Sequence, residues 1–99
     1  MLDIYSLYED SYYLAKNPDV EQAVAAGSFT NGFEHFLYFG QYEGRNPGPF
    51  FDTQFYLEIY PEIADIVSNT GISPIQHFIE YGQFEGRDPF FDFFTDFYL

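Results

Sequence analysis

One stretch of this sequence occurs twice and decides the expected fold: residues 35–47 read HFLYFGQYEGRNP, and residues 77–89 read HFIEYGQFEGRDP. The two copies begin 42 residues apart and keep the same histidine, glycines, arginine and final proline. Self-similarity at a fixed period of roughly 20 to 50 residues is the signature of stacked helical repeats. The chain is therefore expected to contain an internal repeat of about 42 residues.

The similarity continues upstream of this stretch. SYYL at residues 11–14 aligns with QFYL at residues 54–57, and PDV at residues 18–20 aligns with PEI at residues 61–63. Both matches have an offset of 43, so the two units differ in length by a single residue.

The alignment divides the 99 residues into two repeat units and the start of a third. We call residues 8–50 the first segment and residues 51–90 the second segment. Residues 91–99 are interpreted as a partial third unit, since FFD at 50–52 returns at 90–92. We expect residues 1–99 to form a single helical-repeat domain.

Local signals predict three short helices in each unit. A proline at the first helical position starts the middle helix at Pro18 and at Pro61. Asn17 is the expected N-cap in the first segment. Gly27 and Gly71 are placed to end these helices in the left-handed conformation.

The third helix of each unit begins after a typical cap, Asn31 or Ser73. Residues at helical spacing give it an apolar face, which consists of Phe33, Phe36, Leu37 and Gly40 and then of Ile75, Phe78, Ile79 and Gly82. No strand periodicity is sustained. We predict an all-α fold in which short helical repeats stack as a small α-solenoid-like array.

Composition and charge exclude several classes of protein. Phe and Tyr make up 24% of the residues, which argues against disorder. Sixteen acidic residues against three basic ones give a net charge of -13, which disfavours binding to nucleic acid or anionic lipid. There is no cysteine for a disulfide or a thiolate zinc site, and no apolar run is long enough for a membrane span.

The N-terminus lacks the basic start and apolar core of a secretory signal peptide. The compartment stays open: we expect a cytoplasmic protein, or one exported by a non-classical route through a C-terminal signal.

His35 and His77 are the first candidates for chemistry, because histidine titrates near neutral pH and the two occupy equivalent positions. Zinc requires three or four clustered ligands, so a structural role is favoured. We expect each histidine to donate a hydrogen bond that joins adjacent helices.

Arg45 and Arg87 recur within the same Glu-Gly-Arg-x-Pro context. One interpretation is a clamp for a partner's carboxylate or phosphate. The favoured interpretation is a structural ion pair, with Asp52 and Asp92 or with Glu43 and Glu85. The residues expected to hold the repeats together are Arg45, Arg87, Asp52, Asp92, His35 and His77.

Enzyme and cofactor motifs are missing from the sequence. There is no GxSxG, P-loop, GxGxxG or HExxH motif, and no acidic calcium-binding loop. We therefore expect a non-enzymatic protein without catalytic residues, metal ligands or a cofactor.

Read as one consensus, the units run F-D-x-x-Y-Y-L, N-P-D-V-x-x-A-V and E-H-F-x-x-F-G-x-x-E-G-R-x-P. This pattern resembles a tandem helical repeat of bacterial, often cyanobacterial, proteins. Those proteins include secreted proteins with calcium-binding hemolysin-type repeats and glycosyltransferase-associated chains. The resemblance implies an accessory or scaffolding module, and the second segment departs from it at residues 60–63.

The aromatic C-terminus is the main functional hint in the sequence. An uncapped repeat array exposes apolar surface, so this segment is expected either to fold back or to dock onto another protein. The candidate partner-binding residues are Phe90, Phe91, Phe93, Phe94, Phe97 and Tyr98.

The expected function is protein–protein interaction or assembly, as a scaffold- or linker-like subunit of a larger complex. The partner would be another protein, in a heterologous complex or by self-assembly. Two alternatives stay open: a calcium-dependent extracellular or cell-surface repeat module, and an acidic decoy that binds a basic protein.

Overall fold

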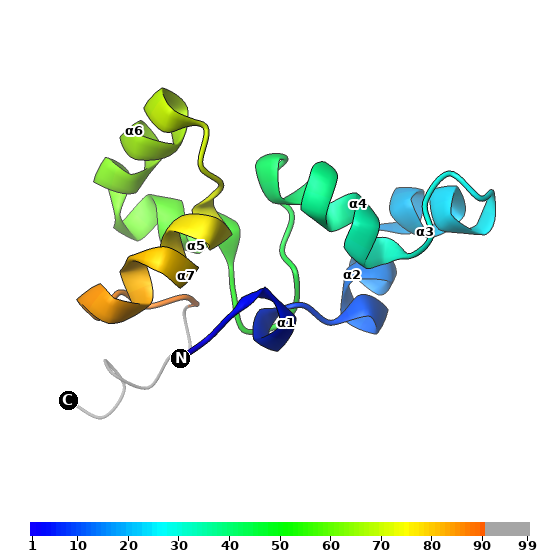
Figure 1. Cartoon of the computed structure of the whole chain (residues 1–99), viewed down its shortest axis with the longest axis horizontal. Coiled ribbons are helices and arrows are strands. Elements are labelled where there is room, and N and C mark those ends of the chain that lie inside the picture. The colour runs from blue at the N-terminus through cyan, green and yellow to red at the C-terminus, as the bar shows by residue number, and fades with distance from the viewer. Residues whose placement is uncertain (91–99) are drawn as a thin grey trace.

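The computed structural model describes residues 1–90, and this part of the chain is all-helical (Figure 1). Its elements are α1 (Ile4–Leu7), α2 (Asp10–Lys16), α3 (Pro18–Ala25), α4 (Gly32–Tyr38), the 3-10 turn η1 (Gly40–Tyr42), α5 (Thr53–Ile59), α6 (Pro61–Thr70), α7 (Pro74–Glu80) and the 3-10 turn η2 (Gly82–Glu85). No strand occurs within these 90 residues, where a single isolated bridge joins Gly48 to Phe51.

The helices form two groups with the same order of elements: three α-helices followed by a 3-10 turn. Figure 1 shows α2–α4 and α5–α7 side by side, which gives an elongated molecule of 46 × 32 × 22 Å. The short helix α1 contacts α7, so the N-terminus crosses from the first group to the second.

Each group is closed by a backbone hydrogen bond between its two ends. The Glu9 amide donates to the Pro47 carbonyl at 3.0 Å, and the Asp52 amide donates to the Pro89 carbonyl at 2.8 Å. The residues after each Glu-Gly-Arg motif therefore return to the start of their own segment.

The predicted helix ends are largely confirmed. Pro18 and Pro61 are the first residues of α3 and α6, because proline lacks the amide hydrogen that this position does not use. Gly71 ends α6 with a φ of 79°, a left-handed conformation that favours glycine. The side chains of Asn31 and Ser73 accept the expected cap bonds from Glu34 and Gln76 amides.

The prediction for Asn17 was wrong in its chemistry. Asn17 occupies the N-cap position of α3 but makes no cap bond with its side chain. Its amide group instead donates to the Tyr13 carbonyl at 2.7 Å, and its oxygen accepts from Arg45 at 2.8 Å. A guanidinium close to the cap position competes successfully for the oxygen, since a charge-assisted hydrogen bond is the stronger one.

The core is a row of aliphatic and aromatic residues from both groups. Its fully buried members are Leu7, Tyr13, Val20, Phe36, Phe51, Tyr56, Ile63, Ile75 and Phe78. On the predicted apolar face of the third helix, Phe33, Leu37 and Ile79 are only half-buried. Complete burial of one large apolar side chain contributes about 1.5 to 3 kcal/mol, so the fully buried core residues dominate the stability of the fold.

Ring geometry is closely matched in the two groups. Tyr13 and Phe36 meet edge to face at 5.4 Å, and Tyr56 and Phe78 do so at 5.7 Å. Edge-to-face packing aligns the positive edge of one ring with the negative face of the other.

Candidate functional site

A buried tyrosine–histidine pair links the first and third helices of each group. Tyr13 Oη lies 2.8 Å from His35 Nδ1, and Tyr56 Oη lies 2.9 Å from His77 Nδ1. Burial raises the pKa of both tyrosine hydroxyls and lowers the pKa of His77. The Tyr56–His77 pair is therefore a hydrogen bond between neutral groups at pH 7, which suits a link between helices.

Glycine is required beside each pair. A Cβ atom on Gly40 would collide with Tyr13 Oη, and one on Gly82 would collide with Tyr56 Oη. The two glycines begin η1 and η2, so the tyrosine hydroxyl lies against the backbone where α4 and α7 end.

Arg45 is held within the first segment by three polar side chains. Its guanidinium bonds Asp19 in bidentate fashion, with Nη1 at 3.0 Å and Nη2 at 2.7 Å, and Nε contacts Glu43 at 2.9 Å. The hydrogen bonds that the Arg45 guanidinium donates to Asp19 hold the pKa of this carboxyl below its ordinary value. Asn17 supplies the third partner, at 2.8 Å from Nη1, so four of the five N–H donors of the guanidinium make these bonds.

Arg87 occupies the same place in the second segment with one different partner. Its Nη1 lies 2.8 Å from Glu62 and its Nε lies 2.8 Å from Glu85. The guanidinium stacks on the Tyr60 ring at 4.6 Å, where Asn17 stands in the first segment. The hydrogen bond from Arg87 lowers the pKa of Glu62.

The placement of Arg45 corrects the expectation that its guanidinium reaches Asp52 in the next segment, since both of its ion pairs lie within the first segment. The Glu43 and Glu85 alternatives describe the ion pairs, whereas the Asp52 side chain caps α5 by accepting from the Phe55 amide. Left-handed turns at Gly44 and Gly86 direct each arginine back onto the middle helix of its own segment. Asp92 lies outside the described residues.

His35 and His77 likewise make their hydrogen bonds within their own segments. The junction between segments is formed by residues that the sequence interpretation passed over. The Ser73 hydroxyl donates to Gln41 Oε1 at 2.6 Å, and the Thr53 amide donates to Asn46 Oδ1 at 2.8 Å. A signal was present, since Gln41 recurs as Gln83 within the repeated stretch.

A second feature that sequence reasoning missed is a set of exposed aromatic rings at equivalent positions. Phe39 and Tyr42 are 48% and 57% exposed, and their counterparts Tyr81 and Phe84 are 52% and 63% exposed. They lie at the end of α4 and in η1, and at the end of α7 and in η2. Rings that expose this much surface are available for contacts with another molecule.

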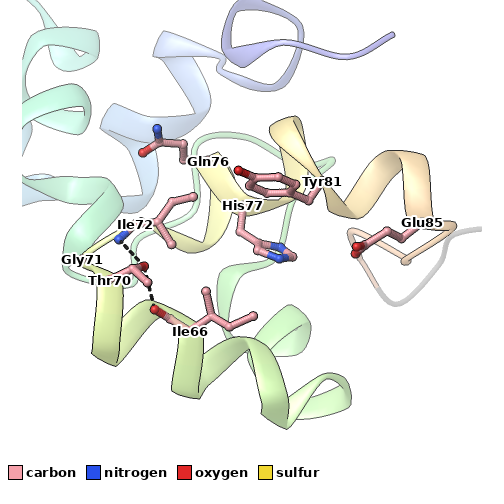
Figure 2. Close-up of a pocket in the computed structure, with 8 residues that line it drawn as sticks. All are labelled: Ile66, Thr70, Gly71, Ile72, Gln76, His77, Tyr81 and Glu85. Carbon is pink, nitrogen blue, oxygen red and sulfur yellow. Dashed lines mark hydrogen bonds between the residues drawn. The ribbon is translucent and has the colours of Figure 1, made fainter.

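A hollow in the second segment lies between α6 and α7 and has a volume of about 630 Å³ (Figure 2). Figure 2 shows His77 and Tyr81 pointing towards it from α7 and the following residue, while Ile66 and Thr70 line it from α6. The Thr70 hydroxyl is already occupied, because it donates to the Ile66 carbonyl at 2.7 Å. Ile72 and Glu85 complete the wall.

Of the six candidate partner-binding residues, the structure describes Phe90 alone. Phe90 is half-buried, and its ring lies 5.9 Å from that of Phe50. Phe91, Phe93, Phe94, Phe97 and Tyr98 lie outside the described residues.

Within residues 1–90, no three His, Asp or Glu side chains converge closely enough to hold a metal ion. Nor does any helix in that range combine the length and apolarity needed to cross a membrane. Comparisons with protein-family models, curated proteins and solved structures found no match.

Proposed function

We propose that this chain is a non-enzymatic protein-interaction module, built as a single domain from helical repeats of about 42 residues stacked in a small α-solenoid-like array. The matched element order, ring geometry and tyrosine–histidine pairs of the two segments support the repeat. Each unit alone is too small to bury its apolar face, so stacking of units supplies the core.

The exposed aromatic rings carry the functional part of the proposal. Phe39, Tyr42, Tyr81 and Phe84 are about half exposed, so about half of the surface of each side chain is open to contact with another molecule. Tyrosine and phenylalanine are enriched at protein interfaces, where they bury large areas at a low cost in side-chain entropy. Their recurrence at equivalent positions favours a partner that contacts both units.

The negative net charge of the chain favours a partner protein that carries basic groups. The chain carries 16 acidic and 3 basic residues, and both arginines are engaged in internal ion pairs. Opposite charge on the partner would speed association, whereas the net charge of -13 makes copies of this chain repel one another.

Affinity capture from the native cells, with crosslinking and quantitative mass spectrometry, tests the proposal. The test variant combines Tyr42→Ser with Phe84→Ser, and the matched control combines Tyr5→Ser with Ile59→Ser, which are also exposed. We expect one protein to be recovered in stoichiometric amounts by the wild type and the control, and at least about tenfold less by the test variant.

Circular dichroism should show the same helicity in all three chains. Equal recovery by all three would contradict the proposal, and so would turnover of a substrate by the purified chain.

A further inference from the structure

The first segment contains a three-ring cluster that the second segment lacks. The Phe29 ring meets His35 edge to face at 5.0 Å and 84°, and it meets Phe39 at 5.8 Å and 77°. His35 and Phe39 also lie 5.8 Å apart. Phe29 belongs to the turn between α3 and α4, so it covers the histidine from the side of the middle helix.

In the second segment only two members of this cluster are present. His77 and Tyr81 lie 5.5 Å apart at 40°, close to the 38° between His35 and Phe39. The sequence has no aromatic residue between Tyr60 and His77. Helix α6 is longer than α3, and its connection to α7 is correspondingly shorter.

The pocket lies on the side of His77 where the third ring is missing. It is bounded by His77 and Tyr81, by Ile66 of α6 and by Ile72 of the connection (Figure 2). Its volume of about 630 Å³ falls within the range of sites that hold small ligands, so a phenyl or phenol ring and its flanking backbone fit. Phe29 thus serves as an internal template for the occupant.

The charge around the pocket indicates which residues of the partner would lie on either side of the bound ring. Residues 61–87 include four acids, Glu62, Asp65, Glu80 and Glu85, and one base, Arg87. Arg87 is paired with Glu62 and Glu85, so this part of the chain keeps a net negative charge, to which Asp65 and Glu80 contribute without an arginine partner. A second copy of this chain, or its own C-terminal residues with Asp92 and Asp96, would bring further negative charge. A basic segment is the complementary partner.

We propose that the pocket between α6 and α7 binds a phenylalanine or tyrosine side chain from a basic segment of a partner protein. The inference rests on the proposed function and specifies the chemistry of its partner. The bound ring would complete in the second segment the cluster that Phe29 completes in the first.

The probe is the capped pentapeptide Lys-Lys-Phe-Lys-Lys, titrated into the full-length chain and followed by amide chemical shifts in NMR. We expect saturable shifts at His77, Tyr81 and Thr70, with one site per chain. Replacing the central Phe by Ala should weaken binding by about tenfold or more, since ring burial supplies much of the affinity. A Glu-Glu-Phe-Glu-Glu peptide should not bind.

Two substitutions separate this site from general attraction to an acidic surface. Ile72→Phe supplies an internal ring beside the pocket and should reduce the affinity about tenfold. Tyr81→Ser, at a half-exposed position, removes one wall and should do the same without loss of helicity. Phe29→Ala opens the equivalent place beside His35, so the number of sites should rise from one to two.

Equal binding of the Phe and Ala peptides would overturn the proposal. So would shifts that depend on the concentration of the chain alone, because they would identify a second copy as the occupant. Neither result affects the proposed function, which is tested through Tyr42 and Phe84, residues outside this pocket. Conversely, equal recovery of a partner by all three chains in that test would overturn the proposed function without changing the peptide affinity measured here, because Tyr42 and Phe84 do not line this pocket.

Discussion

The two segments have the same buried tyrosine, histidine and glycine at their centre, but they differ in the residues that surround this centre. Tyr13, His35 and Gly40 are reproduced by Tyr56, His77 and Gly82 with hydrogen bonds of 2.8 and 2.9 Å. Around this constant centre, Asn17 is replaced by Tyr60 beside the arginine, and Phe29 is replaced by an open pocket. The residues that are the same in both segments are tightly packed, so that even one added methyl group on Gly40 or Gly82 would collide with a neighbouring tyrosine.

The differences therefore mark positions where more than one solution stabilises the same backbone. Arg45 is satisfied by hydrogen bonds from its planar fork, whereas Arg87 also uses its flat face on an aromatic ring. Such substitutions are tolerated because the ion pairs with the acids remain in both segments. These substitutions also give the two segments different surfaces, so we expect the segments to differ in what they bind.

The largest expected effects are those of Gly40→Ala and Gly82→Ala. In each variant the new methyl group collides with a buried tyrosine hydroxyl, so the hydrogen bond to histidine is strained or lost. Each substitution should lower the free energy of unfolding by about 3 kcal/mol in urea denaturation, from overpacking and an impaired buried hydrogen bond. A single urea transition with an unchanged denaturant slope in both variants would show that the two segments unfold as one unit.

A matched rescue identifies the cause. Adding Tyr13→Phe to Gly40→Ala removes the colliding oxygen, and Tyr56→Phe does so for Gly82→Ala. Each double variant should be more stable than the glycine variant alone. A double variant that is less stable would show that the hydroxyl is not the obstacle.

The next largest effect compares the partners of the two arginines. Tyr60→Asn removes a ring that stacks on Arg87 at 4.6 Å, packs on Tyr56 at 5.4 Å, and accepts the Asp88 amide hydrogen at 2.8 Å. We expect a loss of about 2 kcal/mol in the free energy of unfolding. The reciprocal Asn17→Tyr should cost less than about 1 kcal/mol, since a new ring can stack on Arg45. Thermal unfolding would contradict this if the order of the two were reversed.

The element type and the helix starts were predictable from local chemistry. Proline at the first position, a cap with a hydroxyl or amide oxygen, and a left-handed glycine act over a few residues, so Pro61, Ser73 and Gly71 could be read directly. The apolar spacing also located Phe36 and Phe78, both of which are buried.

Long-range partners were not predictable in the same way. The arginines were expected to pair with Asp52 and Asp92 or with Glu43 and Glu85, and the glutamates, two residues away, are indeed partners. The partner that was missed is Asp19, 26 residues before Arg45, which the turn at Gly44 brings within reach. The pocket beside His77 depends on the lengths of α6 and of its connection, which the sequence signals fix only within a few residues. Exposure of Tyr42 and Phe84 followed from packing rather than from residue type, since aromatic residues are usually assigned to the core.

A smaller effect concerns pH and the histidine of the second segment. Burial lowers the pKa of His77 below its ordinary value of 6.5. Arg87 acts in the same direction, whereas Glu85, Glu62 and Glu80 raise this pKa. The unfolded chain therefore binds a proton more readily, so stability is complete above about pH 6.5 and falls as the pH is lowered. Between pH 7.5 and 5 we expect a loss of up to about 1 kcal/mol in the free energy of unfolding.

His77→Gln should reduce this pH dependence, as measured by urea denaturation at each pH. Asp19 and Glu62 do not interfere in this window, because their pKa values lie below 3.8 and 4.5 and their contribution is lost only at more acidic pH. An unchanged pH dependence in the variant would exclude His77 as its source.

The smallest effect is the difference in stability cost between substitutions of two equivalent glutamines, which have different hydrogen-bond partners. Gln41 accepts the hydroxyl of buried Ser73 from the other segment at 2.6 Å, whereas Gln83 bonds the exposed backbone of Leu2 at 2.8 Å. Gln41→Ala should therefore cost about 1 kcal/mol, and Gln83→Ala only a few tenths, because water replaces the lost partner of an exposed group. Gln41→Glu keeps the acceptor and should recover part of the loss in urea denaturation. Equal costs for the two alanine variants would mean that the junction between segments depends on apolar contact alone, and hydrogen exchange at Ser73 would then be unchanged by Gln41→Ala.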